Sequence, residues 1–421
     1  MFDYSQTLFV GIDVSKDSNQ VCLIDFQRTK LLNKSFKNNL EGAAEMKTTF
    51  ISYLSKHNFS NLIIVLESTG IYSIHIANFL SNEAESICPN TLIYLINPII
   101  SHNFNKSNVG SNKTDSFDAF SLADFAASGK TINLNPFKAN QHFAIQSLAR
   151  QRKHYVDLLC KEKTRILNFI FLKFSDFNNS KHGNKSFSNI FGNTSIEVLL
   201  SFKTPEEIAN TPIEELTNFI KSKSKNRFND SFEVAKILQK ASRDSYRLDA
   251  SSYDSINTNI AICFSTIKFY EDIILHIEKE ISKLIKGSSF DQDIFILKSI
   301  PGISTVFATS IISEIGNISN FKSESALAKF AGIYWSENDS GNFISEDHHL
   351  KKTGNPFLRY YLIEASASVI KNNPVFYDFY QKKISEVKTH KESRALVLTS
   401  RKFIRLIFKL LKDKQLYTSP Y

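Results

Sequence analysis

The fold is decided by the stretch Leu8-Phe9-Val10-Gly11-Ile12-Asp13-Val14-Ser15-Lys16, which is continuous, apolar and rich in β-forming residues. Such a run predicts one buried strand. The polar Lys16-Asp17-Ser18-Asn19 separates it from a second run, Gln20-Val21-Cys22-Leu23-Ile24-Asp25, so we expect an antiparallel hairpin. A carboxylate inside a core strand is costly unless a partner offsets its charge. We therefore expect Asp13 to hold a divalent metal over the sheet if further carboxylates reach the same point.

Length and composition exclude several classes of protein. At 421 residues the chain predicts more than one domain. No run approaches the roughly 20 apolar residues of a membrane span. The four cysteines are scattered without CxxC spacing, which argues against a zinc site or a disulfide framework. The first residues lack the pattern of a signal peptide, so we expect a cytoplasmic protein without a membrane partner.

The positive charge is concentrated at the C-terminal end. The net charge is +9, yet residues 348–421 alone carry 15 Lys and Arg against 5 Asp and Glu. The other 347 residues are almost neutral, at −1. This asymmetry predicts a polyanionic partner, most simply DNA or another nucleic acid, and the alternative is a solvated basic face.

The first third of the chain predicts the element order β-β-β-α-β-α-β-α. After the hairpin the expected elements are a strand over 30–37, a helix over 40–56, a strand over 61–70, a helix over 71–80, a strand over 91–96 and a helix over 114–126. Acids stand at the ends of core strands and at the start of the last helix, at Asp13, Glu67, Asp115 and Asp118.

These four acids are more informative as a set than singly. Each alone has an ordinary interpretation as a helix-cap partner or a solvent-facing residue. Asp115 and Asp118 are spaced i, i+3, which places both carboxylates on one helix face. Four carboxylates in this element order are typical of an RNase H-like sheet that gathers a two-metal site for cutting phosphodiesters. Hard oxygen ligands without a His/Cys cluster favour Mg²⁺, with Mn²⁺ as the alternative.

Two long helical patterns occupy the middle of the chain, over 140–175 and 251–286. They predict an antiparallel coiled-coil arm, a dimerisation element or the core of a helical subdomain. The first carries Arg150, Arg152 and Lys153, which are either solvated or follow a phosphate backbone. We therefore divide the chain into a sheet domain over 1–135, a helical region over 136–290 with an inserted segment near 176–250, and a basic C-terminal domain over 291–421.

The C-terminal domain carries two turns of interest. Ile300-Pro301-Gly302-Ile303 lies between two expected helices and is similar to a helix-hairpin-helix, whose amides bind phosphate. Ser340-Gly341 lies beside the basic Lys352-Thr353-Gly354-Asn355-Pro356-Phe357-Leu358-Arg359. It is either an ordinary turn or the position of a hydroxyl nucleophile. From Phe357 onward the sequence predicts basic helices.

Together these motifs resemble the DEDD-type insertion-sequence transposases, which include the pilin gene invertases and the bridge-RNA-guided recombinases. The motifs that carry the resemblance are Gly11-Ile12-Asp13-Val14-Ser15-Lys16, Leu66-Glu67-Ser68-Thr69-Gly70, Lys113-Thr114-Asp115-Ser116-Phe117-Asp118-Ala119, Ile300-Pro301-Gly302-Ile303, Phe330-Ala331-Gly332, Ser340-Gly341 and Lys352-Thr353-Gly354-Asn355-Pro356-Phe357-Leu358-Arg359. Residues 176–250 match nothing in that family.

The resemblance implies an α/β plus mostly-α fold. Its parts are an RNase H-like (RuvC-like) N-terminal domain, a helical coiled-coil middle and a mostly helical C-terminal transposase domain. By motif match it assigns Mg²⁺ ligation to Asp13, Glu67, Asp115 and Asp118, and the role of nucleophile to Ser340. Tyr334-Trp335-Ser336 stands where the family usually has a proline, which makes Ser336 the second choice.

The expected function is that of a DNA transposase or site-specific recombinase in a bacterial or archaeal cytoplasm. The resemblance also implies a structured guide RNA, and we expect a homo-oligomer, either a dimer or a tetramer. The alternatives are a RuvC-like nuclease that acts by hydrolysis and a non-catalytic nucleic-acid-binding protein. The residues expected to contact nucleic acid are Lys113, Arg150, Arg152, Lys153, Gly302, Lys352, Asn355, Arg359, Arg401 and Lys402.

Overall fold

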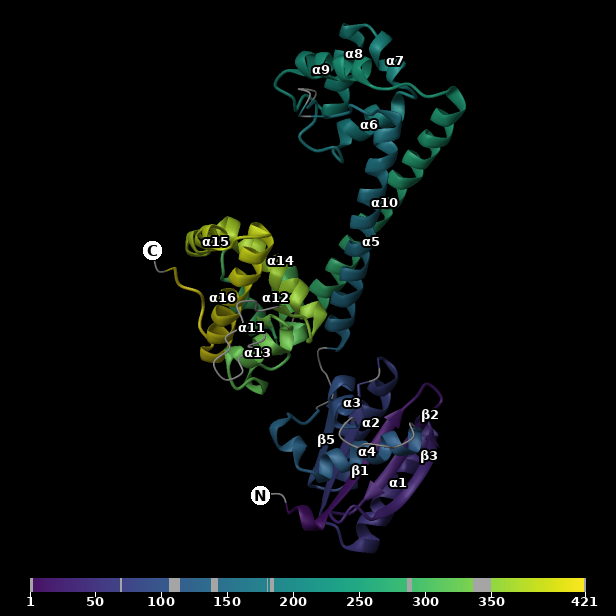
Figure 1. Cartoon of the computed structure of the whole chain (residues 1–421), viewed down its shortest axis with the longest axis vertical. Coiled ribbons are helices and arrows are strands. Elements are labelled where there is room, and N and C mark those ends of the chain that lie inside the picture. Colours follow the sequence, from purple (N-terminus) through teal and green to yellow (C-terminus); the bar gives the residue numbers. More distant parts are fainter. Residues whose placement is uncertain are drawn as a thin grey trace. The chain divides into compact units, whose positions relative to one another are not determined.

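The structure, a computed structural model, divides the chain into two compact units, Met1–Gln141 and His142–Tyr421 (Figure 1). It describes residues 3–68, 70–105, 114–137, 143–179, 181, 185–285, 290–335 and 350–419. The finer division at 135 and 290 stays a prediction.

The first unit is built on a five-stranded sheet. Its strands are β1 (Thr7–Val14), β2 (Ser18–Ile24), β3 (Lys30–Lys37), β4 (Asn61–Glu67) and β5 (Thr91–Ile96). They lie in the order β3-β2-β1-β4-β5, with β1, β2 and β3 antiparallel and with β4 and β5 parallel to β1. This order, with helices on both faces, is that of an RNase H-like domain, so the predicted fold class is confirmed.

The helices of the first unit cover opposite faces of this sheet. They are α1 (Leu40–His57), α2 (Tyr72–Ile87), α3 (Pro98–Asn105) and α4 (Asp115–Ala127), with short 3₁₀ turns at Tyr4–Gln6 and Lys130–Asn133. The even-numbered residues of β1 pack with α1 and α2, whereas Phe9 packs with α4. Because successive side chains of a strand alternate between faces, Gly11 and Asp13 share the α4 face with Phe9.

The second unit begins with two long helices, α5 (Phe143–Lys173) and α10 (Ala250–Ile285), which pack along each other (Figure 1). They run antiparallel, because Arg152 pairs with Glu278 and Lys163, further along α5, pairs with Glu271, earlier in α10. These are the two helices that the sequence predicts to pair.

A small helical insert connects the far ends of these two helices. Its helices are α6 (Asn193–Ser201), α7 (Pro205–Asn210), α8 (Ile213–Ser224) and α9 (Ser231–Asp244). Thr204 caps α7 by accepting from the amide of Glu207, with Pro205 at the first helical position. The buried apolar side chains of the insert form one core with those of the adjoining ends of α5 and α10.

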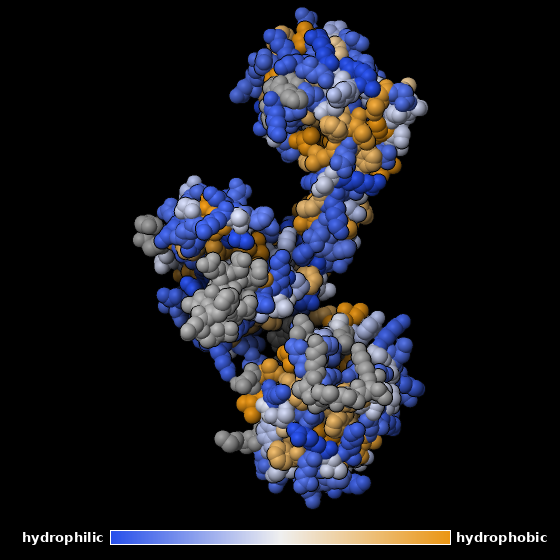
Figure 2. Space-filling view, viewed as in Figure 1, coloured by the Kyte–Doolittle hydropathy of each residue, from blue (hydrophilic) through white to orange (hydrophobic). Residues whose placement is uncertain are grey.

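The rest of the second unit is mostly helical. It comprises α11 (Asp291–Lys298), α12 (Thr305–Ile315), a 3₁₀ turn (Ile318–Asn320), α13 (Glu324–Ala331), α14 (Pro356–Asn372), α15 (Pro374–Glu386), α16 (Lys391–Asp413) and a pair of two-residue strands, β6 (Tyr334–Trp335) and β7 (Leu350–Lys351). In the described residues no helix has both the length and the hydropathy of a membrane span. Hydrophilic side chains cover most of the visible face (Figure 2).

Candidate active site

The first two acids of the site stand on neighbouring parallel strands. Ile12 on β1 is in register with Leu66 on β4, so Asp13 and Glu67 follow at the same edge of the sheet. Ile63 and Val65 pack against the α4 side, and alternation places Glu67 on that side as well. Each carboxylate therefore comes directly after a buried apolar run and faces the layer that contains α4.

The other two acids lie in the first turn of α4. Thr114 begins this helix by accepting a hydrogen bond from the amide of Phe117 at 3.2 Å. Asp115 is exposed and Asp118 is half-buried, and negative charge in a first turn is favoured by the helix dipole. The sequence predicts the start of this helix and the spacing of its two acids.

Gly11 sets the distance between α4 and the sheet. A Cβ at this position would lie 2.0 Å from the carbonyl oxygen of Ala119 and 2.4 Å from the amide nitrogen of Ala123. No side chain fits there, so α4 rests directly on the backbone of β1. Asp118 is one residue before this contact and Asp13 is two residues after it, which brings the two carboxylates near each other.

Electrostatic repulsion shows that the four acids share one region. The pKa of Asp13 is raised to about 6, first by burial and then by the negative charges of Asp118, Asp115 and Glu67. Glu67 accepts a hydrogen bond from the Ser101 hydroxyl at 2.9 Å. The structure thus brings together the four acids named from the sequence, while their catalytic role stays a prediction.

The donor set of this cluster fits a divalent cation, because carboxylate oxygens are the ligands that hard cations prefer. A cation would also relieve the mutual repulsion that raises the pKa of Asp13. The side chains do not form a closed ligand shell: within the described residues, no three Asp, Glu, His or Cys side chains are grouped closely enough to hold one metal ion. Instead, two residues of α3 donate hydrogen bonds to these acids. Ser101 donates to Glu67, and Asn105 donates to Asp118 at 3.2 Å.

Two residues predicted to contact nucleic acid, Arg150 and Asn355, meet at a buried carboxylate in the second unit. Arg150 binds Glu314 in a bidentate manner, with Nε and one terminal nitrogen 2.7 and 2.9 Å from the two oxygens. Asn355 donates to the same carboxylate at 2.7 Å, and Gln146 donates at 3.2 Å. The Asn355 side chain also caps α14 by accepting from the amides of Phe357 and Leu358.

Most of the other predicted contact residues have partners within the chain. Arg152 pairs with Glu278, Lys153 with Asp157, and Arg359 donates to the carbonyl of Lys352. Arg401 donates to the carbonyl of Glu324 and to Ser325, and Lys402 lies over the rings of Phe376 and Phe379. Gly302 adopts a left-handed φ of 95° in the turn before α12, where it packs on the backbone of Ser368. Their contact with nucleic acid stays a prediction.

Three predicted site residues, Lys113, Ser336 and Ser340, lie outside the described residues. The described residues on either side of segment 336–349 do pair, as Tyr334 with Lys351 and Trp335 with Leu350. Gly354 approaches the backbone of Gly332 so closely that a Cβ would lie 2.6 Å from its nitrogen.

Glu314 was not among the site residues predicted from the sequence. Its side chain is fully buried, yet it accepts hydrogen bonds from three residues. The available signal was the lone acid in the apolar helix Thr305–Ile315, because an ionised side chain is buried only when it is paired. Ser101 and Asn105, which bind two of the acids, carried no comparable signal.

An RNase H-like sheet with acids at the ends of β1 and β4 and at the start of α4 defines the class of metal-dependent nucleases and recombinases of this fold. Proteins of this class generally use divalent metal ions. Family models agree with this assignment: the DEDD transposase model of the IS110 group matches residues 10–174, and the transposase model of the IS116/IS110/IS902 family matches residues 295–381. Together they cover more than half of the chain, which belongs to the IS110 family of transposases.

Individual relatives have low sequence identity to this chain, and each matches a shorter part of it than the two family models together. A pilin gene-inverting protein of Moraxella lacunata is 29% identical over 157 residues, which are 37% of this chain and 45% of the relative. An insertion element IS116 protein of Streptomyces clavuligerus is 26% identical over 123 residues, 29% of this chain and 30% of the relative. The chain thus spans less than half the length of these relatives. The RuvC structure of T. thermophilus with a Holliday junction substrate aligns over 31% of this chain and 99% of its own, with 11% identity and a TM-score of 0.24.

Proposed function

We propose that this protein is a transposase that cuts and rejoins DNA at the ends of an insertion sequence. The observation that supports it most is that Asp118, Asp115 and Glu67 lie near enough to Asp13 for their charges to help raise its pKa to about 6. Such a cluster has little structural value, because like charges near a half-buried carboxylate destabilise the fold. Its value lies in binding cations, and both family models that match the chain are models of transposases.

The acids would bind Mg²⁺, or Mn²⁺, against the scissile phosphate. Bound cations supply charge neutralisation at the phosphate and hold the attacking and leaving oxygens in line. The chain's own contribution is to fix the carboxylates on rigid elements. Gly11 lets α4 sit on β1, and the Ser101 and Asn105 hydrogen bonds orient Glu67 and Asp118, which would hold a cation together with Asp13 and Asp115.

Ser340 would be the nucleophile, with Ser336 as the second choice. The support is the motif match together with the pairing of β6 and β7, whose residues flank the segment that carries both serines. Attack of the serine oxygen on a DNA phosphorus would form a phosphoserine bond and release one DNA strand end. Attack by a DNA hydroxyl on that phosphoserine would then rejoin the DNA and free the serine.

The partners we propose are DNA, a structured guide RNA and further copies of the same chain. The C-terminal excess of positive charge supports a polyanionic partner. The acids and the serines belong to different compact units, so one composite site requires the units to meet, either within one chain or between copies.

The test is an excision assay in cells. A plasmid carries the gene with its natural flanking DNA, so that the DNA ends and any RNA encoded beside the gene are supplied. Junction-specific amplification measures excision for the wild type, Asp13→Asn and Asp118→Asn. Asp17→Asn is the matched control, because Asp17 is exposed on the turn after β1. We expect at least a hundredfold loss in the first two variants, and normal excision by Asp13→Asn would refute the proposal.

The serine is tested separately. Ser340→Ala and Ser336→Ala are compared for excision and for a covalent protein–DNA adduct recovered under denaturing conditions. An adduct that only Ser340→Ala abolishes supports the proposed chemistry. DNA cleavage by the wild type without any adduct would replace it with hydrolysis by water, which is the reaction of the alternative nuclease.

A further inference from the structure

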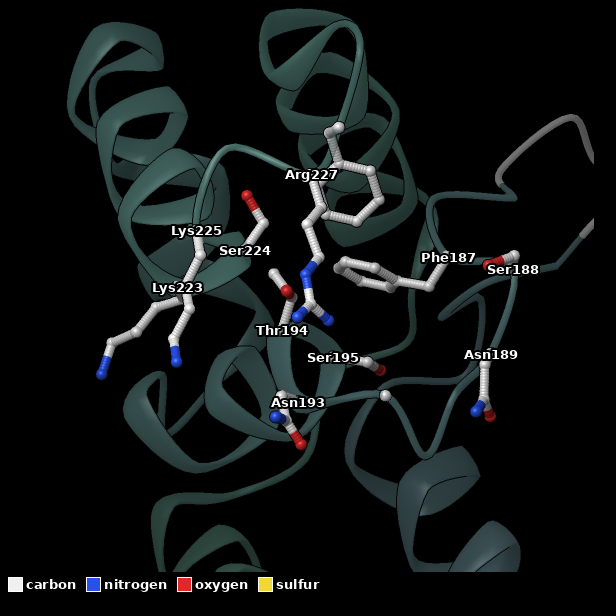
Figure 3. Close-up of a pocket in the computed structure, with 12 residues that line it drawn as sticks. Phe187, Ser188, Asn189, Asn193, Thr194, Ser195, Lys223, Ser224, Lys225 and Arg227 are labelled. Carbon is white, nitrogen blue, oxygen red and sulfur yellow. The ribbon is translucent and has the colours of Figure 1, made fainter.

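The helical insert contains a cavity of about 380 Å³ that the proposed function does not use (Figure 3). This volume is within the roughly 300–1,000 Å³ typical of ligand sites. Neither transposase model matches residues 175–294, so the cavity lies outside the matched parts of the chain. Its lining comes from the segment before α6, the first turn of α6, the end of α8 and the loop after α8.

The first turn of α6 contributes to this cavity three residues whose amides have no acceptor within the helix. The cap residue, Gly192, has no side chain to accept from the helix, and the first bond of the helix is made by the amide of Ile196 to Gly192. The amides of Asn193, Thr194 and Ser195 therefore have no intrahelical acceptor, and all three residues line the cavity. Free amides at a helix start bind anions.

An independent observation comes from Ser195. This residue is 1% exposed, and its hydroxyl has no hydrogen-bond partner among the described residues. A buried hydroxyl without a partner is costly, so it calls for an acceptor that enters the cavity. The hydroxyl of Ser195 lies beside the backbone amide of the same residue. Two adjacent donors favour an anion with several acceptor oxygens.

The opposite wall of the cavity supplies positive charge. Lys223, Lys225 and Arg227 line it, and the Lys221–Arg227 segment contains no acid. Lys223 pairs with Glu197 at 2.5 Å, whereas no ion pair joins Lys225 or Arg227 to another described side chain. Figure 3 shows Arg227 extending from the loop after α8 into the cavity toward Thr194.

We propose that this cavity binds a backbone phosphate of a single-stranded nucleic acid. The free amides, the Ser195 hydroxyl and Arg227 would bind the phosphate oxygens, and Lys225 at the rim would attract the next phosphate. The rings of Phe187 and Phe228, with centroids 6.2 Å apart, offer an apolar wall to the adjoining sugar and base. A strand fits better than a free phosphate, because the cavity lining offers both an aromatic wall and Lys225 as a second cation beside Arg227.

This site goes beyond the proposed function, and its test does not depend on excision. The full-length protein is titrated with a fluorescein-labelled, mixed-sequence DNA 15-mer, and the affinity is measured at several salt concentrations. For Arg227→Gln we expect about tenfold weaker binding. The slope of log affinity against log salt concentration should become less negative by about 0.7, because one phosphate contact is lost. Arg243→Gln is the matched control, because Arg243 is exposed on α9 and lies outside the cavity lining.

A local readout separates this site from nucleic-acid contacts elsewhere. The same 15-mer with bromodeoxyuridine is photo-crosslinked, and the modified peptides are mapped. Crosslinks within residues 185–228 that Arg227→Gln and Ser195→Ala reduce, and that Arg243→Gln retains, support the site. Crosslinks only outside that range would overturn it. Competition by thymidine 5′-monophosphate as strong as that of the 15-mer would also overturn it, in favour of a free-nucleotide pocket.

Discussion

Replacing Asp13 by asparagine should stabilise the first unit of this protein above pH 6. The pKa of Asp13 is raised to about 6 in the folded chain, by burial and by the charges of Asp118, Asp115 and Glu67, against 3.8 without these effects. The folded state therefore binds more protons than the unfolded state between these two values, and stability falls as the pH rises through them. Above pH 6 the ionised Asp13 is a constant cost that asparagine removes.

The size of this cost follows from the shift. One pKa unit corresponds to about 1.4 kcal/mol, so the whole shift sets an upper limit of about 3 kcal/mol. Asp13 is only partly buried, and solvent screening reduces the figure, so we expect about 1–2 kcal/mol at pH 7.5. Near pH 4 the difference between the two proteins should approach zero.

Hydrogen exchange of the full-length protein measures this effect locally, which is necessary because a chain with two compact units need not unfold in one step. The amides of β1 and β4 are compared at pH 5 and pH 7.5 in the presence of EDTA, after correction for intrinsic exchange rates. Asp17→Asn, on the exposed turn after β1, is the control. The reasoning is refuted if Asp13→Asn leaves protection unchanged at pH 7.5, or lowers it.

Three further changes have expected outcomes. Gly11→Ala should lower the stability of the first unit by about 1–3 kcal/mol, seen as a lower melting temperature, because the new Cβ would clash with α4. Glu314→Gln should cost about 2–4 kcal/mol in urea unfolding of the second unit, because it replaces a buried acceptor of three donors by an amide. Addition of 10 mM Mg²⁺ should raise the melting temperature of the wild type but not of Asp13→Asn, which thermal shift measurements can check.

The sheet and its acids could be predicted because their signals are local. Strands β1 and β4 are continuous apolar runs, and each ends in one acid, Asp13 and Glu67. Parallel pairing then brings the two ends together without further information. The start of α4 and the position of Asp118 could be predicted equally well, because the residues that begin a helix lie within about four positions of one another.

The surroundings of the basic residues could not be predicted, because their partners are remote in sequence. Arg150 resembles a phosphate ligand on an amphipathic helix, yet it meets Glu314, which is 164 residues away. Arg401 likewise reaches the start of α13, 77 residues earlier in the chain. No periodicity or local spacing encodes such pairs, which depend on how helices pack after the chain has folded.

The Glu314 network links the start of α5 to the C-terminal core of the second unit. The DEDD transposase model ends at residue 174, near the end of α5, whereas the first compact unit ends at Gln141. Gln146 and Arg150 on α5 bind Glu314 on α12, and Asn355, which caps α14, binds the same carboxylate. The start of α5 is therefore part of the C-terminal core and is constrained by it. Among the described residues, the hydrogen bonds to Glu314 come from Gln146, Arg150 and Asn355 and none comes from the insert, so substitutions in the insert's cavity should leave this network intact.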